Sequence, residues 1–235
     1  MDTKDYILIA LSSCAIVISL ISLVITLIQK NRETHRTIRK TLTDTLENIS
    51  KIEIETTRLK NSKDVNFGSE SIIQLRRNFN TQRRILMVHA DFLIQKYDKL
   101  ATDIDCNLLA VAYSIVGDQE KAEYFWGKSI CKTKSLPIKH MNLRGFGIFY
   151  FENSNIDKGR EKFLEALGMN LIENDSNNVL VSDTYLMLAE YERDFKNKNM
   201  YEQYLTKSME ICSKIINPKR RNEMEERIRL RLPKE

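Results

Sequence analysis

The sequence predicts an all-α protein with one transmembrane helix, a connecting helix and a domain of repeated helix pairs. Helix-breaking residues are few: seven Gly and three Pro occur among 235 residues, against average usage of about 7% and about 5%. A many-stranded β fold needs turn residues roughly every ten positions, so this composition favours long helices. Hydrophobic residues make up 42% of the chain, which allows a sizeable core.

Residues 6–28 are predicted to form the transmembrane helix because they carry no charge. About 23 residues at 1.5 Å each cross a hydrocarbon core about 30 Å thick. A cleaved signal peptide is the alternative, and it would have a basic start, a shorter apolar core and a small-residue cleavage site. Here the acidic residues Asp2 and Asp5 come first, the apolar run is long, and Lys30 follows it. We therefore expect a retained single-pass anchor.

The charges that flank this run predict its orientation. The cations on its C-terminal side are Lys30, Arg32, Arg36, Arg39 and Lys40. On the other side Lys4 is offset by two acidic residues. Lysine and arginine near a span stay in the cytoplasm. We expect residues 1–5 outside and the C-terminal domain in the cytoplasm, with the basic segment close to anionic headgroups of the lipid bilayer.

Small residues recur along one face of the predicted span: Ser12, Ala15, Ser19, Ser22 and Thr26. Such a face lets two membrane helices approach closely and exchange hydrogen bonds, so homo-oligomerisation through the span is one interpretation. The other is that these residue types are common in membrane helices and that the stripe has no role.

Residues 29–63 are predicted to form a juxtamembrane helix with a heptad-like seam. Its members are His35, Ile38, Leu42, Thr45, Ile49, Ile52, Thr56 and Leu59. A parallel coiled coil is one interpretation, and an amphipathic helix lying on the domain or on the membrane is the other. If the small-residue stripe is continued in steps of seven residues, it reaches Glu33 and Arg36. These two positions do not belong to the seam, so the two faces are out of register. Residues 61–69 have loop composition, and the helical domain is expected over residues 64–235.

Three segments of the domain share one pattern of helix, short polar turn and second helix: residues 106–130, 140–167 and 182–211. Equivalent small residues in the three segments, Ala110, Gly147 and Ala189, recur at intervals of 37 and 42 residues, which indicates a repeat. Residues 69–100 form either a degenerate leading unit or one long helix. Residues 223–232 are polar and suited to capping a stack.

These segments resemble the tetratricopeptide-repeat family, whose pattern is W-x2-L-G-x2-Y followed by A-x3-F. The first segment matches at Leu109, Ala110, Tyr113, Gly117-Asp118, Ala122 and Trp126, with Cys106 at the Trp position. The second matches at Leu143, Phe146, Gly147, Tyr150, Phe163 and Ala166, with Gly159 in place of the Ala. The third matches at Tyr185, Leu188, Ala189 and Leu205, but Glu192 and Tyr201 depart from the pattern.

The resemblance implies an α-solenoid of about three units, because such units bury their apolar faces only by stacking. It also implies a groove, lined by the first helix of each unit, that holds a cytosolic protein or peptide. The residues there that packing does not require are Asn107, Val111, Ser114, Arg144, Ile148, Phe151, Leu186, Glu190 and Arg193. A membrane-tethered protein–protein interaction scaffold is the leading hypothesis.

No motif for catalysis, phosphate binding or metal binding is found in the sequence. We therefore expect no enzyme activity, no cofactor and no metal. The three His residues are not at ligand spacing, and Cys106, Cys131 and Cys212 are predicted to be buried reduced thiols.

Two basic clusters support an alternative function, the binding of nucleic acid or anionic lipid. They are Arg76, Arg77, Arg83 and Arg84, and Lys219, Arg220, Arg221, Arg227, Arg229 and Arg231. Nucleic acid is the less favoured partner, because aromatic stacking residues are lacking beside both clusters. A membrane-disturbing effector triggered through the helical domain is a further alternative.

Overall fold

A computed structural model describes the backbone of residues 3–61 and 70–232, and the side chains of residues 18–61 and 70–232. All regular elements in these residues are helices, so the all-α prediction is confirmed. The chain divides into two compact units, Met1–Ala101 and Thr102–Glu235.

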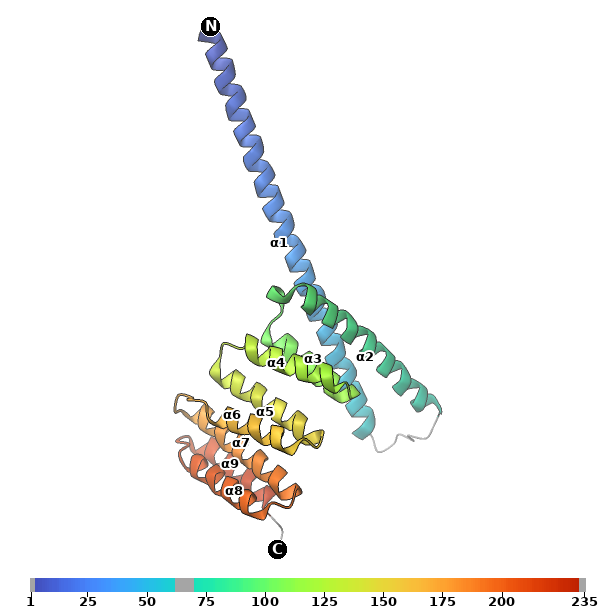
Figure 1. Ribbon diagram of the computed structural model, residues 1–235, viewed down its shortest axis with the longest axis vertical. Helices are drawn as coiled ribbons and strands as arrows, with labels where there is room; N and C mark the ends of the chain where they lie inside the picture. The colour runs from blue at the N-terminus through green and yellow to red at the C-terminus, as the bar shows by residue number, and fades with distance from the viewer. Residues whose placement is uncertain (1–2, 62–69, 233–235) are drawn as a thin grey trace. The chain divides into compact units, whose positions relative to one another are not determined.

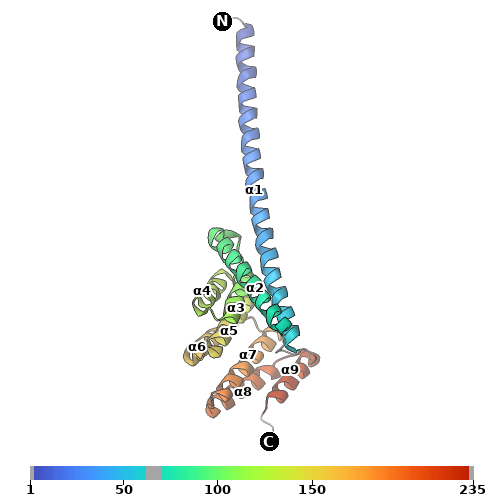
Figure 2. The same ribbon diagram turned by 90° about the vertical axis from the view of Figure 1, so that its right-hand side faces the viewer.

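The first unit is a helical hairpin. Helix α1 spans Thr3–Asn61, α2 spans Glu70–Lys96, and a short 3-10 helix covers Asp98–Leu100. In both views α2 lies alongside the second half of α1 (Figure 1, Figure 2). The two helices are antiparallel, since Thr45 Oγ1 lies 3.4 Å from His89 Nδ1 and Thr56 Oγ1 lies 3.3 Å from Arg83 Nη2.

The seam predicted along the juxtamembrane helix packs within the chain, against α2. Its buried members are Leu42, Thr45, Ile49 and Ile52, joined by Leu46. The buried apolar residues of α2 are Met87, Ala90, Leu93 and Ile94. Residues 70–96 form one long helix, which decides between the two alternatives left open for this segment.

A buried ion pair fixes the register of the hairpin. Arg83 Nε lies 2.6 Å from Glu53 Oε1, and the Arg83 side chain is almost fully buried. Burial raises the pKa of Glu53, although Arg83 opposes the shift. Because an unpaired buried charge is costly, sliding α2 along α1 by one turn would be strongly unfavourable.

The second unit contains three antiparallel helix pairs and one final helix, which follow one another in chain order (Figure 1). The pairs are α3 Asp103–Val116 with α4 Gln119–Lys132, α5 Leu136–Glu152 with α6 Ile156–Leu167, and α7 Asp175–Asp194 with α8 Lys198–Ser213. Helix α9, Pro218–Arg231, packs on both α7 and α8.

The turns inside the three pairs have the same structure. Each has a residue with positive φ, namely Gly117 at 79°, Ser154 at 61° and Lys196 at 61°. The next residue is Asp118, Asn155 or Asn197, and its side chain caps the second helix by accepting a backbone N–H. The backbone N–H groups of these three residues donate to the carbonyls of Tyr113, Tyr150 and Glu192. The turns recur at the predicted intervals of about 37 and about 42 residues.

Small residues allow the two helices of a pair to approach closely. A Cβ on Gly147 would lie 2.5 Å from the Phe163 ring, and one on Gly159 would lie 2.8 Å from the Phe151 ring. Ala110 and Ala122 hold the equivalent positions in the first pair and are fully buried. Large aromatic side chains fill the space around these contacts, as dense packing of the interior requires.

No helix in the described residues is long and apolar enough to cross a membrane. The side chains of residues 6–17, which belong to the predicted span, lie outside the described residues.

The three cysteines whose side chains the structure describes, Cys106, Cys131 and Cys212, are free thiols. Cys106 and Cys212 are buried as predicted, but the prediction for Cys131 was wrong because its side chain is exposed. The buried residues of α4 are Ala122, Phe125, Trp126 and Ser129, which share one side of the helix, and position 131 lies away from that side.

Candidate functional site

The repeated turns align the three pairs residue by residue and so define one common face on α3, α5 and α7. We call it the first-helix face. Its equivalent positions are Ile104, Met141 and Asp183, then Val111, Ile148 and Glu190, and then Ile115, Glu152 and Asp194. The character of the face therefore changes from apolar on α3 to acidic on α7.

The α3 end of this face is apolar and exposed. Ile104, Val111 and Ile115 are 60%, 38% and 50% exposed, and Met141 on α5 is 50% exposed. We call these four residues the α3 patch. Positions 104, 111 and 115 lie on one side of a helix, whereas Leu109 and Ala112 on the other side are buried. Helix α3 thus has apolar residues on two sides. The buried side packs within the domain, and the other side is exposed.

Polar contacts hold α3 against α5 beside the patch. Asn107 Nδ2 donates to Asn142 Oδ1 at 3.0 Å, and Asn142 Nδ2 donates to Thr133 Oγ1 at 2.9 Å. Asn142 is buried, so these hydrogen bonds satisfy an amide that would otherwise be costly to bury. They position the patch on a rigid support.

Polar side chains also join α5 to α7 along the first-helix face. Arg144 Nη1 donates to Asp183 Oδ2 at 2.8 Å, and His140 Nε2 lies 2.8 Å from Thr184 Oγ1. Burial of the His140 ring lowers its pKa to about 4. The ring is therefore neutral at neutral pH and serves as a hydrogen-bonding packing residue.

The acidic end of the face is neutralised by arginines of α9. Arg227 pairs with Asp183, and Arg231 pairs with Glu190. Arg193 Nη1 donates to the Arg231 carbonyl at 3.1 Å. These contacts occupy the charged groups of α7 within the chain itself.

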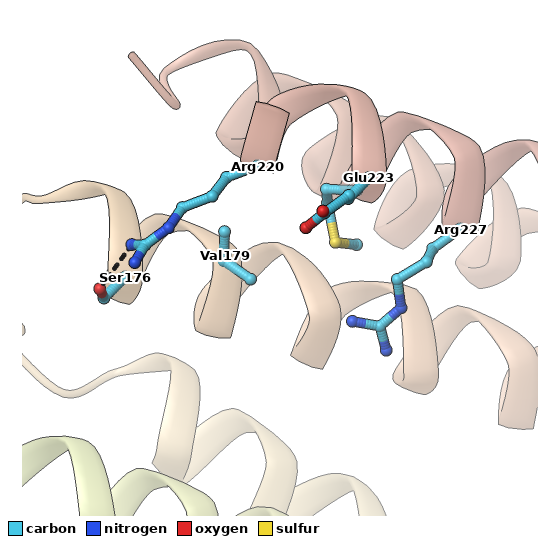
Figure 3. A pocket seen from close by; sticks show the side chains of 6 residues that line it. Ser176, Val179, Arg220, Glu223 and Arg227 are labelled. Atoms are coloured by element: carbon cyan, nitrogen blue, oxygen red, sulfur yellow. Dashed lines mark hydrogen bonds between the residues drawn. The ribbon is translucent and has the colours of Figure 1, made fainter. Parts of the chain in front are cut away.

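A pocket of about 330 Å³ lies where α9 crosses α7. Figure 3 shows Arg220 and Arg227 reaching from α9 toward α7, with Val179 between them. Arg220 Nη1 donates to Ser176 Oγ at 2.8 Å, and Arg227 pairs with Asp183. Both guanidinium groups thus have partners in the protein, and the pocket belongs to the joint that attaches α9.

The nine residues predicted to bind a partner divide into three groups. Phe151 and Leu186 are buried in the core, and Ile148 packs against that core. Asn107, Ser114, Arg144, Glu190 and Arg193 are engaged in hydrogen bonds or ion pairs within the chain. Val111 alone among the nine is an exposed apolar side chain.

Sequence reasoning missed Ile104, Ile115 and Met141 as candidate contact residues. Helix α3 is apolar almost all round, so its exposed side could not be told from its packed side by composition. The signal that could have found them is the alignment with Asp183 and Asp194, which are polar at the equivalent positions of the third pair.

The residues predicted for self-association in the membrane lie on α1. Ser12 and Ala15 are outside the described side chains. Ser19, Ser22 and Thr26 are exposed, and Thr26 Oγ1 donates to the Ser22 carbonyl at 2.8 Å. The two interpretations of this stripe therefore stay open.

Comparison with known proteins brings no relative. No protein-family model, no curated protein and no solved structure matches this chain. Within the described residues, no cluster of three His, Cys, Asp or Glu side chains could hold a metal ion.

Proposed function

We propose that this protein is a membrane-tethered, non-catalytic interaction module whose helix pairs bind an apolar segment of a cytosolic protein through the α3 patch. The observation that carries the proposal is the exposure of Ile104, Val111, Ile115 and Met141 on one face. An exposed apolar cluster on a rigid helical support is typical of a protein-binding surface.

The charge pattern of the face supports an apolar ligand. The acidic residues Asp183 and Glu190 of α7 already have arginine partners, whereas the patch on α3 and α5 is apolar and 38–60% exposed at its four residues. A partner segment with two or three apolar anchors would cover the patch, and each fully buried aliphatic side chain contributes roughly 1.5–3 kcal/mol.

The tether in this proposal is the uncharged run at residues 6–28 followed by basic residues. The repeat pattern supports a scaffold similar to the tetratricopeptide repeats, with three pairs joined by equivalent turns. Anchoring in a membrane would raise the local concentration of copies and compensate for the small area of one patch.

The alternative function, binding of the phosphate groups of nucleic acid or anionic lipid, is less well supported by the C-terminal basic cluster. In the C-terminal basic cluster, Arg220, Arg227 and Arg231 each contact a group on α7. Nucleic acid or lipid would have to compete with these contacts. The proposed protein ligand requires no such rearrangement.

Photo-crosslinking tests the proposal. A benzoylphenylalanine placed at Val111 or Ile115 of the full-length protein in native membranes is expected to give discrete adducts with a protein partner. Met141→Glu should reduce their yield at least tenfold, because a charge in the patch opposes apolar contact, and tenfold corresponds to about 1.4 kcal/mol.

The matched control is the same probe at Leu164, a leucine of α6 that is 48% exposed outside the first-helix face. No adduct of the same mass is expected there. Equal adducts at Leu164, or adducts that survive Met141→Glu unchanged, would contradict the assignment of the patch.

A further inference from the structure

Helix α2 is apolar on two opposite sides. One side carries the buried residues Met87, Ala90 and Ile94. On the other side Ile85, Val88 and Phe92 are 64%, 62% and 54% exposed. Residues spaced by three and seven positions lie one above another on a helix, so these three form a continuous stripe, which we call the α2 stripe.

The surroundings of the α2 stripe are basic. Between residues 71 and 96 the only acidic residue is Asp91, which is buried and accepts a hydrogen bond from Gln95. The exposed cations of the same segment are Arg76, Arg77, Arg84 and Lys96. Arg77 and Arg84 are spaced by seven residues and follow one edge of the stripe.

We propose that the α2 stripe is the docking surface for an acidic amphipathic helix of a partner protein. An apolar row spaced by three and four residues fits the apolar face of a second helix packed along α2. Acidic residues beside that face would meet Arg77 and Arg84, and Phe92 would be the aromatic anchor.

The direction of α2 favours a protein over a bilayer surface. The stripe lies alongside the part of α1 that includes Thr45 and Glu53, which contact His89 and Arg83. At 1.5 Å per residue, these two α1 residues lie roughly 25 and roughly 40 Å beyond Ile28 along one continuous helix. If residues 6–28 span the membrane, as in the proposed function, α2 is remote from the bilayer and runs along the anchor axis. An interfacial helix must instead lie in the membrane plane.

Charge also disfavours a second copy of this chain. Packing one α2 stripe on another would give Arg77 and Arg84 of each copy no exposed acidic partner on residues 71–96 of the other copy. Like charges across an interface are repulsive, so an acidic partner is the better complement. This surface belongs to the first unit, whereas the α3 patch belongs to the second.

Titration with designed peptides tests the inference. Full-length protein in zwitterionic nanodiscs is mixed with a fluorescent amphipathic helix peptide of about 20 residues, long enough to be partly helical. One version has leucines on one face and glutamates elsewhere, and the other has lysines in place of the glutamates. We expect anisotropy to show binding of the acidic peptide and none of the basic one.

Three variants locate the site. Val88→Glu combined with Phe92→Glu should weaken binding of the acidic peptide at least tenfold. Arg77→Gln combined with Arg84→Gln should weaken it severalfold and flatten its dependence on salt. Ile172→Glu, at an 80% exposed isoleucine in the loop between α6 and α7, should leave binding unchanged.

Several outcomes would overturn the inference: equal binding of both peptides, no effect of the stripe variants, or an equal loss with Ile172→Glu. Capture of anionic vesicles that the stripe variants abolish would assign the surface to lipid, and a dimer that they dissociate would assign it to a second copy. Since the four substituted side chains are exposed, an unchanged circular dichroism spectrum is expected. The variant Val111→Glu separates the two proposals, because it should impair only the α3 patch.

Discussion

At the scale of single residues, two helical glycines have opposite surroundings. A Cβ on Gly147 would approach the Phe163 ring to 2.5 Å and the Gly159 carbonyl to 3.0 Å. A Cβ on Gly127 would meet no atom within 4 Å. The first glycine is required by the close crossing of α5 and α6, whereas the second only adds flexibility to the unfolded chain.

These surroundings predict that replacing each glycine by alanine has opposite effects on the free energy of unfolding. Gly147→Ala should lower the free energy of unfolding by about 1–3 kcal/mol, because the added methyl group forces Phe163 to move. Gly127→Ala should raise it by up to about 1 kcal/mol. Trp126 is the only tryptophan and is nearly buried, so its fluorescence in a denaturant titration reports this region. A gain in stability for Gly147→Ala would contradict the packing described for this crossing.

His140 predicts a dependence of stability on pH. Its pKa is about 4 in the folded protein and about 6.5 when unfolded, so between these values the unfolded state binds more protons. Stability from this group is complete above about pH 6.5 and is lost as the pH falls toward 4. At pH 5 the loss relative to pH 7 is about 2 kcal/mol.

His140→Gln keeps a polar group near Thr184 but does not titrate in this range. The difference between wild type and variant, measured by the same tryptophan fluorescence from pH 7 to pH 5, isolates the histidine from the carboxylates. Parallel stability curves for the two proteins would show that His140 is protonated without penalty in the folded state.

At the scale of helices, the pairs α5–α6 and α7–α8 are joined by a buried ion pair. Glu192 is fully buried at the position that Tyr113 and Tyr150 hold in the other pairs. Arg160 of α6 donates to its carboxylate, with Nη2 at 2.8 Å from Oε2, and Asn197 Nδ2 donates at 2.9 Å. The hydrogen bond to Glu192 raises the pKa of Arg160. Glu192 thus stands where the other two pairs have a tyrosine, and Arg160 of the neighbouring pair neutralises its charge.

Arg160→Met should therefore destabilise the second unit by about 3–5 kcal/mol, because it leaves a buried carboxylate without its cation. The double variant Arg160→Met with Glu192→Leu should recover most of this loss, since an apolar pair of similar volume is often neutral. Denaturant unfolding of the wild type, both single variants and the double variant measures the coupling. Additive losses would show that the two side chains do not act as a pair.

At the scale of the whole molecule, the small-residue stripe predicts self-association. Each interhelical polar contact in a membrane contributes only about 0.6 kcal/mol, but confinement in the membrane plane makes weak contacts effective. We expect the full-length protein to form cross-linked oligomers in membranes. Ala15→Leu combined with Ser19→Leu should reduce their yield, because larger side chains prevent close approach while the segment stays apolar.

A matched control for this prediction is Ile21→Leu combined with Val24→Leu, which changes two apolar side chains on the side of α1 opposite the stripe and should leave the oligomer yield unchanged. An identical yield for the stripe variant, or a monomer of the full-length protein in mild detergent, would refute self-association through this face.

The all-α class, the positions of the three helix pairs and the spacing of their turns follow from the sequence by itself. These features depend on neighbours within a few residues: Asp118, Asn155 and Asn197 cap the helices that follow them, and a residue with positive φ precedes each. Local hydrogen bonds and the small and large residues of each pair act over one helix–turn–helix unit, so their pattern is visible in a linear sequence.

Only the tertiary structure decided which apolar and charged faces find a partner within the chain. The seam of α1 packs on α2, Phe151 and Leu186 enter the core, and the arginines of α9 neutralise α7. The α3 patch and the α2 stripe have the same local periodicity as buried faces and yet are exposed. Periodicity specifies that a helix has an apolar side, but what covers that side depends on segments tens of residues away, whose approach is set by the packing of the whole unit.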